Sequence, residues 1–408
     1  MKKYLEYIKL EQERQNNTIC LIASENYVSK DVLSALGSCL TNKYAEGYPK
    51  KRYYAGNRII DEVELWCINQ ALKAFNLGSN SWHVNVQPYS GSPANLAIYL
   101  GLLKPGDKVM ALQLSQGGHL THGHSVSFTG KLFNFVHYGV DENGWIDYDK
   151  VERQAVEYKP KLIVSGTTAY SRKLDFKRFR KIADKVGALL LADISHIAGL
   201  IATGLHPNCF DYADVVMTTT HKTLRGPRGA VIFCQKKYAN MIDKAVFPGM
   251  QGGPHLNVIL AKGVAFLEAQ DKNFIKYQKQ VIENARVLAE ELIKNHVSIV
   301  TGGTENHLML IDLQKSKHGA SFFQDRLEEV GIVVNKNTIP NDPRSPLDPS
   351  GIRVGTPAVT TRGMKKKEMK KIAQIIGQLC KDDVSDLVLG RLKKQVRGLT
   401  DSFPLKDL

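Results

Sequence analysis

Cysteine is scarce in this chain and long apolar runs are absent, and each absence excludes a class of protein. The 408 residues hold six cysteines, no two of them in a C-x-x-C pair: Cys20, Cys39, Cys67, Cys209, Cys234 and Cys380. This pattern indicates neither a zinc clip nor a redox dithiol, and it favours a reducing compartment. No apolar run approaches membrane-spanning length, and the charged start MKKYLEYIKLEQERQ lacks the apolar segment of a signal peptide. We therefore expect a cytoplasmic protein without a metal centre.

Acidic residues are outnumbered, with 55 lysines and arginines against 40 aspartates and glutamates and a formal charge of +15. Such a charge suits anionic partners, including nucleic acid, nucleotides and polyglutamated cofactors. The basic residues are dispersed, however, and the densest run, Lys365-Lys366-Lys367 with Lys370 and Lys371, fits a solvent-facing helix surface. A nucleic-acid partner therefore remains an alternative that rests on charge alone.

Repeats and Pro/Ser-rich linkers are also absent, so the fold class has to come from the hydrophobic pattern. Short apolar runs predict buried strands over residues 108–112, 161–166, 187–193, 214–219 and 230–234. Amphipathic stretches such as DFKRFRKIADKVG lie between several of them and predict helices. This alternation is typical of a largely parallel sheet with helices on both faces, in which ligands bind beyond the carboxyl ends of the strands.

The C-terminal part has a different pattern. A long helical pattern covers roughly residues 256–295, and the runs VSIV, HLMLIDL, GIVVN and GIRVGTPA then alternate with helices. We interpret this part as a smaller α+β domain. The expected division is an N-terminal arm with a large domain over residues 1–279 and a small domain over residues 280–408.

The stretch ADVVMTTTHKTLRGPRGAVIF, residues 213–233, places a lysine between two strand-like runs. A buried lysine is costly unless it is paired or neutral, and a free lysine with a pKa of about 10.4 is a poor nucleophile. Lys222 becomes useful as a Schiff base with an aldehyde cofactor or when it is desolvated, and Thr219 and His221 could order such a site. The alternative is a turn lysine in solvent.

Asp193 ends the strand-like run GALLLAD, where a carboxylate faces the crevice beyond the sheet. Pyridoxal phosphate needs a carboxylate at its ring nitrogen, because the protonated ring withdraws electrons from the substrate carbanion. A metal ligand and a helix cap are the alternatives, and His196 is close enough to orient Asp193. We expect the polar segments 167–171, which include Thr168, and 218–222 to lie beside it.

Two segments upstream have the composition of cofactor-binding loops. Ser90-Gly91-Ser92 precedes a proline and a strong helix pattern, and exposed amides at a helix start bind phosphate, although any capped helix shares this pattern. The segment SQGGHLTHGHS holds three histidines, of which His119 would suit a flat ring lying over a cofactor. Metal binding by the histidines is the alternative.

Two further polar groups stand out. Arg353 lies inside the strand-like SGIRVGTPA, where a guanidinium could bind a carboxylate in bidentate fashion or form a structural salt bridge. Glu46 lies among tyrosines in NKYAEGYPKKRYY, which is neither a helix face nor a strand alternation. Loops of this kind commonly carry function.

Taken together, these segments resemble the serine hydroxymethyltransferase family. The likeness runs from LIASEN to GTPAVTTRG and includes LTNKYAEGYP, GGHLTHG, TTTHKTLRGPRG, FPGMQGGP, NKNTIPNDP and SGIRVGTPA. The resemblance implies an α/β fold of the aspartate aminotransferase type, with a mostly parallel seven-stranded sheet and a smaller α+β C-terminal domain. It also implies reversible transfer of the serine hydroxymethyl group to tetrahydrofolate through a pyridoxal phosphate Schiff base, giving glycine and 5,10-methylenetetrahydrofolate.

The resemblance assigns roles residue by residue. Lys222 would hold the cofactor, Asp193 would pair with its ring nitrogen, and His119 would stack on its ring. Further cofactor contacts are implied for Ser90, Gly91, Ser92, Thr168 and His196, and for Tyr44 and Gly253 from a partner chain. Arg353, with Ser24 and His196, would place the substrate amino acid, with its carboxylate on Arg353, and Glu46 and Tyr54 would also contact the substrate. Catalytic roles beside Lys222 are implied for Thr219, His221 and, from the partner chain, Glu46 and Tyr54. Folate contacts are implied for Leu114, Gly117, Gly118, Leu120 and Asn337.

A site built from two chains implies a homodimer, with a tetramer left open. This sequence departs from the family pattern at Tyr89, Pro93, Ala55, Ser195 and Leu347, and none of these changes removes a catalytic group. Ser195 places a hydroxyl where the family has a methyl near the cofactor ring. A sister pyridoxal phosphate enzyme, such as a threonine aldolase or an α-methylserine transferase, is the alternative, but it need not keep YAEGYP and NKNTIPNDP.

Overall fold

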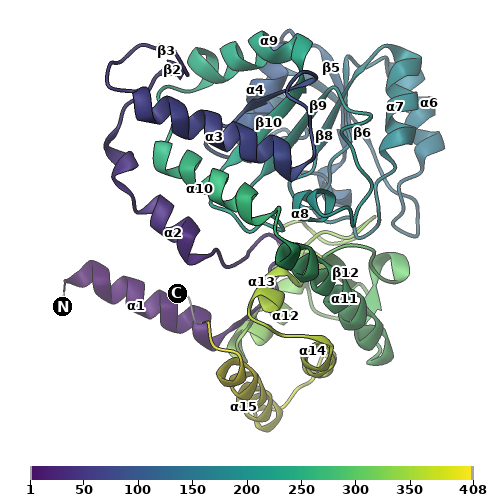
Figure 1. Cartoon of the computed structure of the whole chain (residues 1–408). Coiled ribbons are helices and arrows are strands. Elements are labelled where there is room, and N and C mark those ends of the chain that lie inside the picture. Colours follow the sequence, from purple (N-terminus) through teal and green to yellow (C-terminus); the bar gives the residue numbers. More distant parts are fainter. Residues whose placement is uncertain (1, 406–408) are drawn as a thin grey trace.

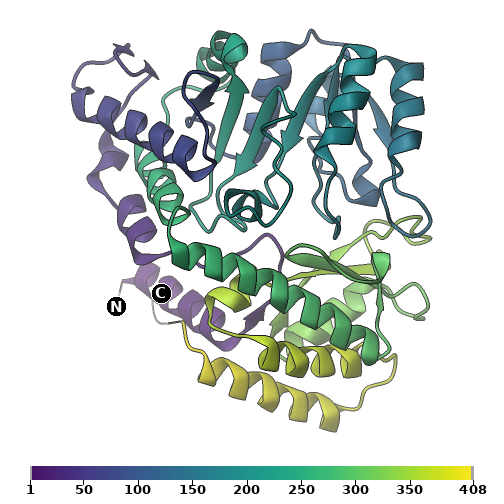
Figure 2. The same cartoon turned by 45° about the vertical axis from the view of Figure 1, so that its right-hand side comes forward.

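The computed structural model describes residues 2–405, which form a larger part built on one sheet and a smaller part beside it (Figure 1). The helix α11 (Lys272–Lys294) runs along the junction between the two parts, as the turned view in Figure 2 shows. The helix α1 (Lys3–Asn17) projects from the small part and has no buried residue.

A seven-stranded sheet forms the centre of the larger part, with the strand order β4-β10-β9-β8-β7-β5-β6. Its strands are β4 (Trp82–Asn85), β5 (Lys108–Leu112), β6 (Asn134–Tyr138), β7 (Leu162–Val164), β8 (Leu189–Asp193), β9 (Val215–Thr219) and β10 (Ala230–Gln235). The five neighbouring strands β9, β8, β7, β5 and β6 pair in parallel. The strand β10 runs antiparallel to both β9 and β4. The five predicted strands and the mostly parallel sheet are therefore confirmed. The two strands that the hydrophobic pattern did not predict, β4 and β6, are the edge strands, whose partial exposure admits polar residues.

The segment around Lys222 reverses the chain between β9 and β10. The Thr220 amide donates to the Gly229 carbonyl at 3.1 Å, and the Gly226 amide donates back to the Thr220 carbonyl at 2.7 Å. The Thr220 hydroxyl donates a hydrogen bond across the loop to the Pro227 carbonyl at 2.5 Å. Because these bonds satisfy the loop backbone, Lys222 is held at the end of β9 rather than inside the sheet.

Helices cover both faces of this sheet because its strands alternate between two apolar cores. In β8, for example, Leu190 and Ala192 belong to one core and Leu191 to the other. The first core also takes side chains from α3 (Arg58–Ala74), α6 (Tyr148–Tyr158), α7 (Phe176–Val186), α8 (Ala198–Ala202) and α10 (Leu256–Glu268). The second takes them from α4 (Gly91–Leu102) and α9 (Ala239–Lys244), with the short α5 (Phe128–Leu132) beside it. Remaining elements of this part are α2 (Lys30–Leu36) and the hairpin β2 (Gly47–Tyr48) and β3 (Lys51–Arg52).

The smaller part has an antiparallel sheet of order β11-β12-β15-β14. Its strands are β11 (Ser298–Ile299), β12 (Leu308–Asp312), β14 (Asn335–Asn337) and β15 (Gly351–Gly355), and its helices are α11, α12 (Ala320–Glu329), α13 (Pro357–Thr361), α14 (Lys366–Leu379) and α15 (Asp386–Ser402). The lysine run at residues 365–371 is exposed on α14, as its spacing predicted. From the N-terminal arm, β1 (Ile19–Cys20) pairs in parallel with β13 (Ile332–Val333), so Ile19 belongs to the core of the smaller part.

One expectation differs from the structure in detail. The long helical pattern over 256–295 is two helices, α10 and α11, because the Asp271 side chain accepts from the Asn273 amide and starts a new helix. The expected boundary at 279/280 falls inside α11 and stays a prediction. Among residues 2–405, no helix is long and apolar enough to cross a membrane.

Candidate active site

The polar segments that follow β5, β7, β8 and β9 meet at the carboxyl edge of the large sheet, around a cavity of about 240 Å³. The predicted site residues that line this cavity, called here the Lys222 cavity, are Ser24, Gly91, Leu114, Gly118, His119, Leu120, Thr168, Asp193, His196, Thr219, Lys222 and Arg353. Most come from different strand ends, because parallel strands bring their carboxyl ends to one edge.

Lys222 presents its amine to this cavity. Its Nζ donates to the Thr219 hydroxyl at 2.7 Å, and within the described chain no carboxylate forms an ion pair with it. Burial lowers the pKa of Lys222 to about 8, while the Asp193 carboxylate acts in the opposite direction. The amine is therefore much easier to deprotonate than an exposed lysine, which makes it a usable nucleophile.

Asp193 is a buried carboxylate with a full set of donors. Its Oδ2 accepts from Asn95 Nδ2 at 2.9 Å and lies 3.1 Å from His122 Nε2. Its Oδ1 accepts from the Ser195 hydroxyl at 2.6 Å and from the Ser195 amide at 3.1 Å. Burial acts to raise the pKa of Asp193, but the hydrogen bonds and the His122 charge outweigh it and hold the pKa below its usual range. Asp193 is thus an anion suited to a cationic ring nitrogen.

Two histidines that line the cavity are kept neutral. Burial, reinforced by the His122 charge, lowers the pKa of His119 to about 4, and its Nδ1 lies 2.7 Å from the Thr121 hydroxyl. Burial also holds the pKa of His196 well below its usual range. The His196 Nδ1 lies 3.2 Å from Nε2 of His307, a fully buried ring. A neutral His119 ring has the flat, uncharged face that stacking on an aromatic cofactor requires.

Arg353 on β15 brings a cation from the smaller part into the cavity. It donates to the Thr168 carbonyl at 2.7 Å and reaches the Ser24 hydroxyl at 3.5 Å. Among the described residues no carboxylate forms an ion pair with it, so the structural salt bridge is not seen there. Burial lowers the pKa of Arg353 to about 10. A half-buried guanidinium without a carboxylate partner is suited to a substrate carboxylate.

The predicted phosphate loop opens α4. Ser90 precedes the helix and its side chain makes no capping bond, so the first amides of the helix stay available. A Cβ at Gly91 would lie 2.8 Å from Thr219 Cγ2, so glycine lets this loop approach the Lys222 segment closely. Amine, carboxylate, flat ring and helix start therefore lie around one cavity, and this donor set fits pyridoxal phosphate.

Of the predicted folate residues, Leu114 borders a second cavity of about 520 Å³, which shares Leu114 and Thr168 with the first; Gly118 and Leu120 line only the Lys222 cavity, and Gly117 lines neither cavity. Asn337 lines this second cavity. Gly117 has a φ of +105°, and a Cβ at Gly118 would lie 2.1 Å from the Leu112 carbonyl oxygen, so this turn requires both glycines. The Thr168 hydroxyl fixes the turn by donating to the Gly118 carbonyl at 2.6 Å.

Four predicted residues lie together but away from the Lys222 cavity of their own chain. The Tyr44 and Tyr54 rings are 5.0 Å apart, and the Tyr44 hydroxyl lies 3.4 Å from Glu46 Oε1. A Cβ at Gly253 would be 3.3 Å from the Tyr44 ring. Tyr44 and Tyr54 are 54% and 42% exposed, which leaves their rings open to a neighbouring chain.

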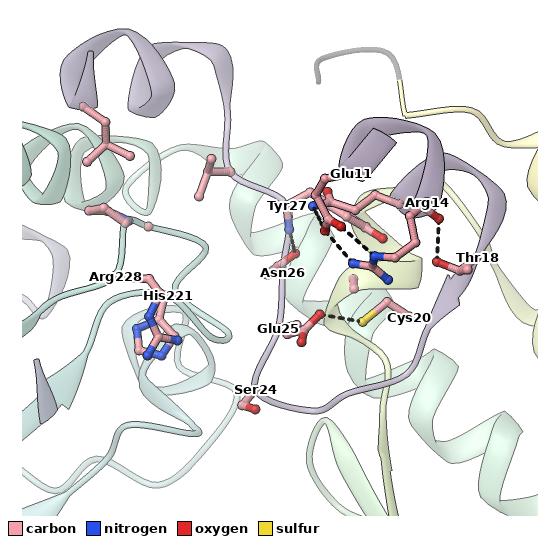
Figure 3. Close-up of a pocket in the computed structure, with 16 residues that line it drawn as sticks. Glu11, Arg14, Thr18, Cys20, Ser24, Glu25, Asn26, Tyr27, His221 and Arg228 are labelled. Carbon is pink, nitrogen blue, oxygen red and sulfur yellow. Dashed lines mark hydrogen bonds and ion pairs between the residues drawn. The ribbon is translucent and has the colours of Figure 1, made fainter. Parts of the chain in front are cut away.

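His221 does not line the Lys222 cavity either. It lines a different cavity of about 460 Å³, where it lies near Arg228 and across from Glu11 and Arg14 of α1 (Figure 3). Burial lowers the pKa of His221 to about 3, and its Nδ1 has no hydrogen-bond partner among the described residues. Its predicted catalytic role stays a prediction that this placement does not favour.

Sequence reasoning missed the partners of Asp193. Asn95 is a fully buried amide in the otherwise apolar α4, and that polar position in ANLAIYLGLL was an available signal. His122 belongs to the segment of three histidines, which has no periodicity that could rank one above another. Among residues 2–405, no group of three His, Cys, Asp or Glu side chains is arranged to hold a metal ion.

Two comparisons with known proteins identify the family of this chain. A family model described as serine hydroxymethyltransferase matches residues 2–376. A curated relative from Desulfotalea psychrophila, described as serine hydroxymethyltransferase, is 53% identical over 401 residues, which are 98% of this chain and 93% of the relative.

Proposed function

The chain belongs to the serine hydroxymethyltransferase family, and from that premise we propose that the Lys222 cavity is its active site. The enzyme interconverts serine and glycine, with tetrahydrofolate as co-substrate and pyridoxal phosphate as cofactor. The observation that carries the site assignment is the meeting of a half-buried amine, a buried carboxylate and an arginine without a carboxylate partner around one cavity.

Each residue of the cavity has a separate proposed role toward the cofactor. When bound, pyridoxal phosphate supplies an electron sink for the electrons of a bond broken at the substrate Cα. Lys222 would supply the amine that holds the cofactor aldehyde. Asp193 would pair with the ring nitrogen, His119 would cover the ring, and the Ser90-Gly91-Ser92 loop would bind the phosphate.

The substrate carboxylate would bind Arg353, with Ser24 and His196 beside it. A two-bond contact to the guanidinium would fix the orientation of the amino acid, and so select which bond at its Cα reacts. Folate would occupy the adjoining cavity past Leu114 and Asn337. The shared wall at Leu114 and Thr168 supports direct transfer of a one-carbon unit between the two ligands.

We infer that the active site is shared between two chains. Glu46, Tyr54, Tyr44 and Gly253 gather on the surface of their own chain instead of lining its Lys222 cavity. The helix α1 exposes apolar side chains that a partner chain could cover: Tyr4, Leu5, Tyr7, Ile8 and Leu10. In a dimer, Glu46 and Tyr54 would reach the partner's cavity and handle protons and the hydroxymethyl group. Dimer versus tetramer, the cytoplasmic location and the absence of a nucleic-acid partner stay predictions.

Mixing two inactive variants tests the shared site. Lys222→Ala removes a residue that a chain contributes to its own active site. Glu46→Ala removes a residue that, in this proposal, a chain contributes to the active site of its partner. In a mixed dimer one site collects both defects and the other collects none, so about a quarter of the unsubstituted activity should return in a one-to-one random mixture. No recovery after verified subunit exchange would show that Glu46 serves its own chain. A spectrum before and after adding glycine with tetrahydrofolate tests the activity itself.

A further inference from the structure

Ser195 connects the two halves of the cofactor site. It is 8% exposed, and its hydroxyl donates to Asp193 Oδ1 at 2.6 Å. The same oxygen accepts the Thr219 amide at 3.1 Å, and the Thr219 hydroxyl accepts Lys222 Nζ at 2.7 Å. One hydroxyl therefore links the carboxylate at one end of the site to the strand end that carries Lys222.

Asp193 has no spare capacity for another donor. A carboxylate offers about four lone-pair sites on its two oxygens. Asn95 and, when its Nε2 carries a proton, His122 occupy Oδ2, while the Ser195 amide and hydroxyl occupy Oδ1. A ring N–H that approaches Asp193 must therefore displace one of these donors or share an oxygen with it.

The Ser195 hydroxyl is the donor best able to move. The Ser195 amide is fixed by the backbone, and the Asn95 amide group is also held by the Thr121 hydroxyl at 2.9 Å. A hydroxyl needs only to rotate, and Met217 Sδ lies 3.6 Å from this one as a weaker alternative acceptor. While it points to Asp193, the hydroxyl withdraws charge from the carboxylate, and when it turns away it gives up a short, charge-assisted bond.

We propose that the Ser195 hydroxyl is a positioning group that competes with the cofactor ring nitrogen for Asp193, and so weakens the hold of this enzyme on its cofactor. This inference rests on the proposed function, in which Asp193 faces the ring nitrogen. Removing the hydroxyl should strengthen binding of the cofactor through that nitrogen. A serine that only fills space would not discriminate between cofactors with and without the nitrogen.

The test compares pyridoxal phosphate with an analogue that carries carbon in place of the ring nitrogen. The dissociation constants of both are measured by equilibrium dialysis against the cofactor-free full chain, and their ratio, analogue over cofactor, is the readout. In Ser195→Ala the ratio should rise roughly threefold to tenfold, as expected when one charged hydrogen bond no longer competes. The Thr219 amide loses its acceptor in this variant, but that disturbance affects both ligands and cancels in the ratio.

Ser165→Ala is the matched control, because Ser165 is fully buried near the same strand ends and its hydroxyl donates to the Leu191 carbonyl at 3.3 Å, not to Asp193. Its ratio should equal that of the unsubstituted chain. Ser195→Cys keeps the size with a weaker donor and should move the ratio in the same direction by less, which keeps the test available if the alanine variant folds poorly. An unchanged or lower ratio in both Ser195 variants overturns the proposal. A ratio near one in the unsubstituted chain and in Asp193→Asn alike overturns the placement of Asp193 as well.

Discussion

Lys222 and Lys262 are two lysines of the large part whose surroundings differ, although burial lowers the pKa of each to about 8. The Lys262 side chain is 1% exposed, and its Nζ donates to three carbonyls, those of Val86, Pro88 and Ala230, at 2.8–2.9 Å. Lys222 Nζ has one hydroxyl partner and faces a cavity.

The difference separates a structural cation from a reactive one. Three carbonyl acceptors use all three N–H groups of Lys262, so this amine has nothing left to offer a ligand. Lys262 thereby fixes the backbone just before the phosphate loop and at the start of β10. Lys222 keeps two N–H directions unused by the described chain, which is what a group that forms and exchanges a bond requires. A lowered pKa alone therefore does not identify the functional lysine; the number of satisfied donors does.

The largest expected effect is the loss of serine turnover when Lys222, the reactive lysine of the pair, is replaced. Lys222→Arg keeps the charge but cannot form the exchangeable bond to the cofactor aldehyde, so serine turnover should fall roughly 1,000-fold or more. The far-UV circular dichroism, which reports the fold, should stay unchanged. The absorbance of the covalently held cofactor should disappear. Lys222→Arg with ordinary turnover would show that another amine holds the cofactor.

Arg353, like Lys222, is half-buried and faces the cavity without a carboxylate partner among the described residues. Arg353→Lys keeps the charge and loses the planar fork, so the KM for serine should rise roughly tenfold to a hundredfold while cofactor absorbance persists. Steady-state kinetics with serine measures this. An unchanged KM would assign Arg353 to the structure rather than to the substrate.

The reactive residues could be predicted from the sequence because they end apolar strands. Lys222 and Asp193 follow runs whose periodicity shows the strand, and parallel pairing then places both at one edge. Their partners could not be predicted in this way. Asn95 and His122 lie 98 and 71 residues from Asp193 in the chain, so only the folded structure shows the contacts. Lys262 was missed for the same reason, because its helix reads as apolar and its acceptors are backbone atoms on other elements.

Lys262→Met should affect stability rather than chemistry. Three buried carbonyls lose their donor, and the relief of a buried charge offsets only part of that loss, so the free energy of unfolding should fall by about 2–3 kcal/mol. Denaturant titration of the cofactor-loaded enzyme measures the change. Turnover should stay within a few fold of the unsubstituted enzyme wherever the variant is folded. A loss of cofactor absorbance in folded Lys262→Met would mean that this lysine also takes part in the cofactor site.

The smallest effect is the part of the pH dependence of stability that Lys262 contributes in the loaded enzyme. Its pKa is lowered on folding from 10.5 to about 8, so above pH 8 the unfolded chain binds more protons at this site than the folded chain. The free energy of unfolding therefore gains from this lysine as pH rises, by roughly 1 kcal/mol between pH 8 and pH 9, because the cost of burying its charge disappears. Denaturant titrations at several pH values should show this gain in the unsubstituted enzyme relative to Lys262→Met. Lys366→Met, which removes an exposed lysine paired with Glu283 at 2.6 Å, is the matched control and should run parallel to the unsubstituted enzyme. Equal slopes for all three proteins would mean that Lys262 stays charged in the folded chain over this range, held by its three carbonyls.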